Sequence, residues 1–230
     1  MAPGGGVLGQ ERNDGLAVAY RMPSPTKAGN PANPQGRPRD PSVDRAILRA
    51  ALEIFVEDGV DGASIEKIAK HAGVGKTSIY RRWTSREALL AQAIEVSRNA
   101  AGYTIDLLER TQPRDLIKLL IEAGAAIAKP EVRKLTARLI GSSPDYPKLI
   151  EIYRETYYLP RRRAFVGALE RAQTAGLLAE NTDLETLADM LIGALTHRLL
   201  MSAPGENSAG EFRDHMIKLL RQAGFDVSQG

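Results

Sequence analysis

The chain of 230 residues contains no cysteine, which excludes a disulfide framework and thiolate chemistry. It also has no apolar run of the roughly 18 residues that a membrane-spanning helix needs, so no membrane span is predicted. Its N-terminus lacks the apolar segment of a secretory signal. These absences lead us to expect a cytoplasmic protein that has no membrane partner.

Features of enzymes are missing as well. The three histidines, His71, His197 and His215, lie far apart in the sequence, and none has metal-ligand spacing to a second ligand. No Gly-x-Ser-x-Gly motif occurs. No glycine-rich phosphate loop follows a strand, because no segment of useful length alternates apolar and polar residues. We therefore predict that the protein is not an enzyme and needs no metal or cofactor.

What the sequence does contain is a strongly patterned segment over residues 64–86. Apolar residues recur at the spacing i, i+3, i+4, i+7 over residues 65–72, which predicts a short helix with one buried face. Gly73 is expected to end this helix, because glycine adopts a left-handed backbone at little cost. Ile79 and Trp83 lie four residues apart, as on the buried face of a second short helix. The segment therefore predicts two helices joined by a tight turn.

The outer side of this second helix is basic. The segment from Lys76 to Arg86 carries four cations and no acid, although the net charge of the whole chain is only +3. A short helix that is apolar behind and basic in front fits the major groove of DNA. Lys76 and Arg86 directly follow the expected helix caps Gly75 and Ser85, where the helix dipole disfavours a cation. Either DNA phosphates occupy both helix ends, or this is a solvated basic face.

Three patterns between Asp40 and Leu90 resemble one known family. They are an opening helix with Ile47, Leu48, Ala51, Leu52 and Phe55; then Ser64-x3-Ile68-Ala69-x2-Ala72-Gly73-Val74; and then Ser78-Ile79-Tyr80-x2-Trp83-x-Ser85-Arg86-Glu87-x-Leu89. Together they resemble the TetR-type transcriptional regulators. The family usually has Phe at Trp83 and Lys at Arg86, and often Ser at Gly75, where this chain lacks one potential hydroxyl contact.

The resemblance implies a role in DNA binding for individual residues. The side chains best placed for base edges are Lys76, Thr77 and Arg81. The side chains best placed for phosphates are Ser64, Tyr80, Arg82 and Arg86. The implied partner is a double-stranded DNA operator.

The remainder of the chain is predicted to be helical. Helical spacing occurs over residues 86–104, 113–128, 131–141, 146–175, 183–203 and 209–223. Pro160 is expected to kink or divide the fourth of these runs. The predicted fold is all-α, with a three-helix DNA-binding domain containing the helix-turn-helix over residues 40–88. A helical ligand-binding and dimerisation bundle is expected over residues 89–226.

Residues 1–39 are predicted to be a disordered tail, because Gly, Pro, Asn and Ser interrupt any helical or strand pattern. Arg37 and Arg39 either form an arm that reaches DNA or belong to a solvated tail. Asp40 and Pro41 are expected to cap and begin the first helix.

Two apolar stripes near the C-terminus predict a homodimer. Two such helices from each subunit would form a four-helix bundle across a two-fold axis, which is also usual in the family that the chain resembles. The predicted interface residues are Leu184, Leu187, Leu191 and Leu195 on one helix and Phe212, Met216, Leu219 and Leu220 on the other. The alternative is that these stripes pack only inside the monomer.

A cavity for a small, mostly apolar effector is expected among the middle helices. Its candidate lining combines apolar bulk with phenol hydroxyls: Leu139, Ile140, Tyr153, Tyr157, Phe165 and Leu169. Ordinary core packing is the alternative for each of them. A group of arginines either holds an acidic group of the effector or forms a solvated helix face: Arg154, Arg161, Arg162 and Arg163.

These patterns favour a dimeric one-component transcriptional regulator, a repressor that binds a palindromic operator and is released by a small molecule. One alternative is an activator, or a DNA-binding regulator controlled by a protein partner without a small-molecule ligand. A second alternative is a helical protein that binds or transforms a small molecule and keeps a vestigial DNA-binding domain.

Overall fold

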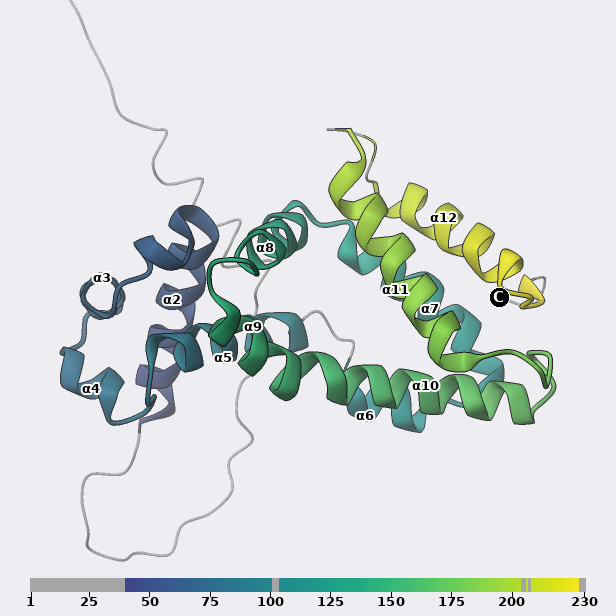
Figure 1. The fold of residues 1–230 in the computed structure, drawn as a ribbon, viewed down its shortest axis with the longest axis horizontal. Coiled ribbons are helices and arrows are strands. Elements are labelled where there is room, and N and C mark those ends of the chain that lie inside the picture. Colours follow the sequence, from purple (N-terminus) through teal and green to yellow (C-terminus); the bar gives the residue numbers. More distant parts are fainter. Residues whose placement is uncertain (1–39, 101–103, 204–205, 207, 228–230) are drawn as a thin grey trace, which may run out of the picture.

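The computed structural model describes residues 40–100, 104–203, 206 and 208–227. The predicted tail over residues 1–39, with Arg37 and Arg39, lies outside the described residues. Within the described part of the chain, all regular structure is helical, as predicted (Figure 1). The helices are α2 (Pro41–Gly62), α3 (Ile65–His71), α4 (Lys76–Tyr80), α5 (Arg86–Asn99), α6 (Ile105–Arg110), α7 (Pro113–Ile127), α8 (Pro130–Gly141), α9 (Pro147–Tyr153), the π-helical turn η1 (Arg154–Tyr158), α10 (Leu159–Thr174), α11 (Leu184–Met201) and α12 (Ala209–Gln222).

Helix α2 begins as the sequence predicts. The Asp40 carboxylate accepts a hydrogen bond from the Ser42 backbone N–H at 2.9 Å, and Pro41 occupies the first turn, where its missing N–H costs nothing. Gly59 interrupts the helix near its end with φ 77°, a left-handed conformation that glycine adopts easily. The last turn of α2 therefore changes direction just before α3.

A core shared by two parts of the chain supports the helix-turn-helix. We call it the N-terminal core: the buried apolar residues of α2 to α5 together with Leu135 and Leu139 of α8 and Leu149 of α9. The five apolar residues predicted for the opening helix are all buried within it. Helices α8 and α9 thus bury side chains against the DNA-binding helices, so this core spans both sides of the predicted domain boundary at residues 88–89.

A second cluster, the C-terminal core, is formed by the buried apolar residues of α7, α10, α11 and α12 with Leu178 and Phe225. Helices α7 and α12 approach closely at Gly124, where an added Cβ would lie 3.3 Å from the Cβ of Met216. In Figure 1 these helices lie at the opposite end of the molecule from α3 and α4. None of the helices in the described residues is long and apolar enough to cross a membrane.

The predicted dimer stripes largely form this C-terminal core. The five residues that are buried within one chain are Leu187, Leu191, Phe212, Met216 and Leu220. The other three are partly buried and pack against the same core: Leu184, Leu195 and Leu219. The i, i+4 spacing correctly identified an apolar face, but that face covers the helices of the same chain, as the alternative to dimer packing required.

The long run predicted over residues 146–175 changes its helical form just before Pro160, near the point where a kink or a division was expected. Helix α9 passes into the π-helical turn η1, and α10 begins at Leu159 with Pro160 in its first turn. A wider π turn relieves the loss of the hydrogen bond that proline cannot donate. The structure also adds a short helix, α6, which begins after the cap Thr104 and lies between the predicted runs 86–104 and 113–128.

Candidate nucleic-acid interface

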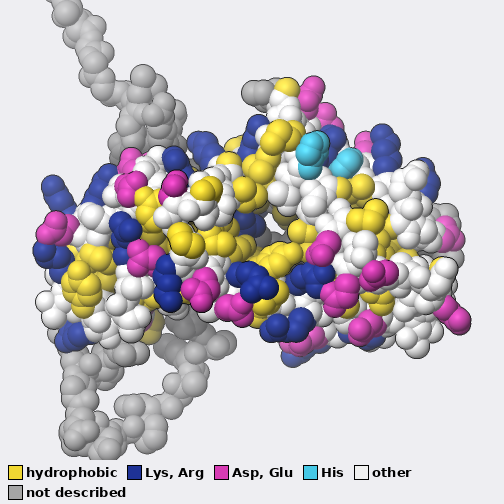
Figure 2. Space-filling view, viewed as in Figure 1, with side chains coloured by type: hydrophobic (Ala, Val, Ile, Leu, Met, Phe, Trp, Pro, Cys, Tyr) yellow, Lys and Arg dark blue, Asp and Glu magenta, His cyan; other side chains and the backbone are white. Residues whose placement is uncertain are grey.

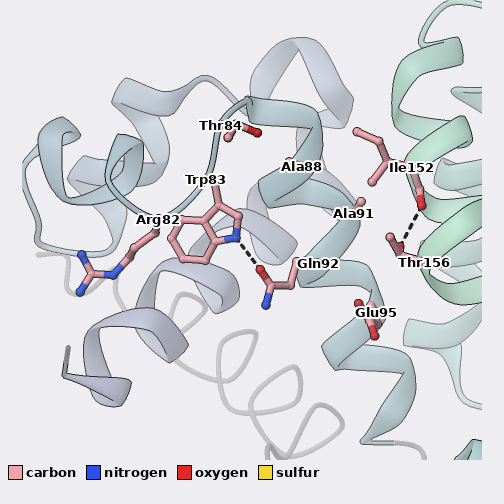
Figure 3. Close-up of a pocket in the computed structure, with 9 residues that line it drawn as sticks. All are labelled: Arg82, Trp83, Thr84, Ala88, Ala91, Gln92, Glu95, Ile152 and Thr156. Atoms are coloured by element: carbon pink, nitrogen blue, oxygen red, sulfur yellow. Dashed lines mark hydrogen bonds between the residues drawn. The ribbon is translucent and has the colours of Figure 1, made fainter.

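Helix α4 is fixed to the molecule by its apolar side. The Ile79 side chain is fully buried, and Trp83, which follows the helix, is also buried. The Trp83 indole Nε1 donates a hydrogen bond to the Gln92 side-chain oxygen at 2.6 Å, as Figure 3 shows. The preceding turn uses Gly73 at φ 67°, as predicted. The backbone of α4 is therefore positioned by α2, α3 and α5, and its other side is left open.

The open side of α4 carries the residues predicted to read DNA. Lys76, Thr77, Tyr80 and Arg81 are all exposed, and the Tyr80 side chain has 61% of its surface accessible. An exposed tyrosine beside cations is suited to contacts with the DNA backbone, because its ring packs on sugars while its hydroxyl meets a phosphate. In Figure 2 the end of the molecule that carries α3 and α4 displays Lys and Arg side chains interspersed with acidic and apolar ones.

The caps of α4 and α5 lie where the sequence predicts them, at Gly75 and Ser85. The Lys76 ammonium, in the first turn of α4, forms an ion pair with Glu66 of α3. The hydrogen bond to Glu66, followed by its charge, raises the pKa of Lys76 above its usual value. Both side chains are largely exposed, so the pair contributes little to stability and Lys76 can exchange Glu66 for a DNA group.

Arg82 points inward instead. Its Nε forms an ion pair with Asp44 of α2, and its Nη1 donates to the Ser78 carbonyl at 2.8 Å. Only 12% of the Arg82 side chain is exposed. The guanidinium therefore connects the end of α4 to the first turns of α2. The residues around Arg82 in the sequence could not reveal this contact, because its partner Asp44 lies far away along the chain.

Arg86 also has partners within the protein. Its Nη1 donates to the Val60 carbonyl at 3.2 Å, its Nε lies 3.1 Å from the Glu87 carboxylate, and the guanidinium lies 6.0 Å from the centre of the Tyr146 ring. Through the Val60 carbonyl, Arg86 joins the start of α5 to the end of α2. Tyr146 is itself hydrogen-bonded to Asp61, which raises the pKa of Tyr146. The remaining residue predicted for phosphates, Ser64, caps α3 by accepting a hydrogen bond from the Lys67 N–H at 3.2 Å.

The six residues expected to line an effector cavity are not brought together. Leu139 is buried in the N-terminal core, whereas Phe165 and Leu169 are buried in the C-terminal core. Ile140 is exposed. Two of the six do meet: the rings of Tyr153 and Tyr157 are stacked with centroids 5.1 Å apart.

A cavity of about 280 Å³ lies behind α4, between α5 and the end of α9 (Figure 3). Trp83, Gln92 and Glu95 line one side of it, and Ile152 and Thr156 line the other. None of the six predicted residues contributes to this lining. It adjoins Arg82, Trp83 and Thr84, which connect α4 to α5, so a change in its shape would reach the DNA-binding segment directly.

A contact between residues far apart in the sequence joins α8 to α2. The guanidinium of Arg138 on α8 donates to the Val56 and Glu57 carbonyls of α2 at 3.3 and 2.9 Å. These carbonyls lie in the turn of α2 that precedes the Gly59 kink. The sequence could not identify this contact, because the residues are more than eighty positions apart and no local pattern marks them.

Comparison with known sequence families gives two matches along the chain. Residues 47–93 match the family described as "Bacterial regulatory proteins, tetR family". Residues 112–219 match the family described as "Tetracyclin repressor-like, C-terminal domain". The first match contains the helix-turn-helix, and the second extends from α7 into α12.

Individual relatives agree with these matches. The chain is 31% identical over 182 residues to the uncharacterized HTH-type transcriptional regulator YdeS of Bacillus subtilis, covering 76% of this chain and 87% of that protein. It is 28% identical over 182 residues to the DNA-binding transcriptional repressor TetR of Mycobacteroides abscessus, covering 78% and 94%. The fold is similar to that of a transcriptional regulator from Saccharomonospora viridis in complex with choline, with a TM-score of 0.62, 18% identity and coverage of 81% and 100%.

Proposed function

This chain belongs to the TetR family of bacterial transcriptional regulators, and we propose that it is a dimeric repressor that binds a palindromic operator and is released by a small molecule. Like its relatives, it is a transcriptional regulator and not an enzyme. We assign it to the cytoplasm, where its DNA would be.

The exposed side of α4 is the observation that carries this proposal. Lys76, Thr77 and Arg81 project from a helix whose other side is anchored by Ile79 and Trp83. Within the described residues Arg81 makes no ion pair, so its five N–H donors are available for a guanine edge. We propose that Lys76, Thr77 and Arg81 contact bases, and that Ser64 and Tyr80 contact phosphates.

The inward contacts of the other two cations refine their roles. We propose that Arg82 positions α4 through Asp44 and does not itself bind phosphate. Arg86 is 29% exposed on its side chain, and it contacts Val60, Glu87 and Tyr146. We propose that Arg86 contacts a DNA phosphate while it keeps its hydrogen bond to the Val60 carbonyl of α2.

The proposed release requires that an effector in the helical bundle changes the position of α4. Arg138 supplies one connection, because it joins α8 to the carbonyls of α2. Helix α5 supplies another, since it follows the recognition segment directly and lines the cavity behind it. A ligand that binds one arrangement of α5 and α8 better than the other would change the spacing of the two recognition helices.

The proposed dimer uses the outer face of α11. Met190, Ala194, His197 and Met201 follow one another at i, i+4, i+7 and i+11, in a stripe that borders the buried side of the helix. Met190 and Met201 are exposed by 65% and 69%. Gly193 lies beside them and has open space around it, so a second copy of α11 can approach closely. In the proposed dimer, isologous pairing through this face relates the two α4 helices by the two-fold axis and presents both at the same end of the dimer.

Selection of duplexes from a random pool by the full chain tests the proposal. We expect enrichment of a palindrome whose half-sites are centred about one helical turn, or a multiple of it, apart. Arg81→Ala should cost about 1–3 kcal/mol on the selected site and relax one base preference. Arg110→Ala is the matched control, because Arg110 is exposed on α6 and should leave binding unchanged. A pool with no enriched sequence would contradict the function.

A further inference from the structure

A polar cluster lies where the regulatory helices meet. Ser97 and Arg98 come from α5, Tyr157 from η1 and Arg161 from α10, and Tyr153 stacks on Tyr157 from the end of α9. We call these five residues the arginine–tyrosine cluster. The Arg161 guanidinium lies 3.7 Å from the centre of the Tyr157 ring, and that of Arg98 lies 6.0 Å from it. Two cations therefore lie near one aromatic ring.

Neither cation is neutralised. Among the residues that the structure describes, Arg98 and Arg161 make no ion pair with a carboxylate. Arg98 donates to the Thr136 hydroxyl at 3.0 Å, and Arg161 donates to Asn99 and to the Tyr157 carbonyl, which are all neutral acceptors. The charge of Glu95 is near enough to raise the pKa of Tyr157, but Glu95 forms no ion pair with either arginine. Two partly buried cations without an acid are costly to the folded state.

Three hydrogen-bond donors in the cluster also lack an acceptor. They are buried and unpaired in the described structure: the Arg98 Nε, the Arg161 Nε and the Ser97 hydroxyl. A buried donor without a partner costs free energy that an incoming acceptor would return. The surrounding phenols stay neutral, because burial raises the pKa of Tyr153 to about 12 and also raises that of Tyr157. The cluster is therefore rich in donors and positive charge.

We propose that this cluster binds the carboxylate of an organic acid, and that such an acid is the effector. Two guanidinium groups and one hydroxyl match the two oxygens of a carboxylate, which together accept about four hydrogen bonds. The stacked rings of Tyr153 and Tyr157 offer an apolar surface for the body of the ligand. A quaternary ammonium compound such as the choline bound by the Saccharomonospora viridis regulator would instead meet two positive charges.

The position of the cluster gives binding a route to DNA. Two of its members lie on α5, which follows the recognition segment. The other three lie on or beside the π-helical turn η1, a wider and less regular backbone that recurs at functional sites. The Thr136 partner of Arg98 lies on α8, two residues before Arg138, which holds α2. Because the unpaired donors are buried, an acid reaches them only when these helices shift.

The experiment measures the melting temperature, Tm, of the full chain with matched pairs of probes: decanoate with decanamide, and benzoate with benzamide, together with choline. We expect at least one carboxylate to raise Tm by several degrees at millimolar concentration, while its amide and choline do not. Arg98→Gln and Arg161→Gln should each weaken binding of that carboxylate more than about tenfold. Arg163→Gln is the control, because Arg163 is an exposed neighbour on α10.

Two further readouts separate this proposal from its alternatives. Ligand-free Arg98→Gln and Arg161→Gln should melt at the wild-type temperature or above it, since each removes an unpaired charge. Arginines with only a structural role would lower Tm and leave carboxylate affinity unchanged. The proposal is overturned if neither carboxylate raises Tm, or if an amide binds as well as its acid.

The inference rests on the proposed function, so DNA binding is measured in parallel. A protein that binds its selected palindrome but responds to neither carboxylate contradicts the effector class alone. A protein that is stabilised by a carboxylate but selects no duplex contradicts the regulatory function alone.

Discussion

At the scale of single residues, the cations of the helix-turn-helix divide into two groups that their sequence does not distinguish. Lys76 and Arg81 are exposed, whereas Arg82 is bonded to Asp44 and Ser78 and Arg86 to Val60. The sequence identified all four as a basic patch from their charge and order. It could not tell which guanidinium turns inward, because the acceptors Asp44 and Val60 come from α2, more than twenty positions away.

Arg82 therefore has a testable structural role. Arg82→Ala should lower the free energy of unfolding by about 1–2 kcal/mol, because it removes charge-assisted hydrogen bonds that are largely shielded from water. Chemical denaturation of the DNA-free protein measures this. Asp44→Asn should give part of the same loss. A phosphate contact would behave differently: stability would be unchanged, and the dependence of DNA affinity on log salt would become shallower by about one unit.

At the scale of elements, the caps and turns were the most predictable features. Asp40, Gly73, Gly75 and Ser85 lie at the helix ends that local chemistry assigned to them. Such signals act over three or four residues and need no knowledge of the fold. The short helix α6 was missed, because it lies between the predicted runs 86–104 and 113–128 and its few residues are too short to show a helical period.

Two glycines provide a matched test of the turn. Gly73 has φ 67° and Gly141 is the last residue of α8, and a Cβ added at either would touch nothing. Gly73→Ala should destabilise the protein by about 1–2 kcal/mol, because only backbone strain opposes it. Gly141→Ala should instead stabilise it by up to about 1 kcal/mol through helix propensity. Equal melting temperatures for the two variants would show that the turn carries no strain.

At the scale of the whole molecule, the apolar stripes were predictable as faces but not as interfaces. Leu191 and Met216 repeat at helical spacing whether they cover their own chain or a second one, and the structure places them in the C-terminal core. Tyr153, Tyr157 and Arg161 were effector candidates from the sequence, but that they meet Ser97 and Arg98 of α5 was unpredictable for the same reason. Spacing shows which side of a helix is apolar, whereas the neighbour of that side depends on how distant helices pack, as the meeting of Arg98, Tyr157 and Arg161 illustrates.

The connection through Arg138 predicts a variant that separates DNA binding from its regulation. Arg138→Met keeps the apolar stem but loses the bonds to Val56 and Glu57. We expect operator affinity within a few-fold of wild type, and a reduced ability of the effector to release DNA, because the shift of α8 no longer reaches α2. Fluorescence anisotropy of labelled operator with and without effector measures both. Full release by this variant would remove Arg138 from the pathway.

The outer face of α11 predicts how the dimer can be broken without unfolding the monomer. Met190→Glu with Met201→Glu places two charges on side chains that are exposed in one chain, so folding should be retained. Across a two-fold interface the same charges would be buried and unpaired, and the dimer should dissociate. Sedimentation velocity distinguishes the two states. The control is Leu107→Glu, which changes an exposed apolar residue on α6 and should leave the dimer intact.

Titration of the wild-type chain against its selected palindrome, a single half-site and a scrambled duplex tests the central claim most directly. At about 0.15 M salt we expect two chains per palindrome and an affinity at least about a thousandfold above that for the scrambled duplex. The half-site should bind weakly, because one short helix reads only a few base pairs. Equal affinity for all three duplexes, or one chain bound per palindrome, would contradict a two-fold, site-specific regulator.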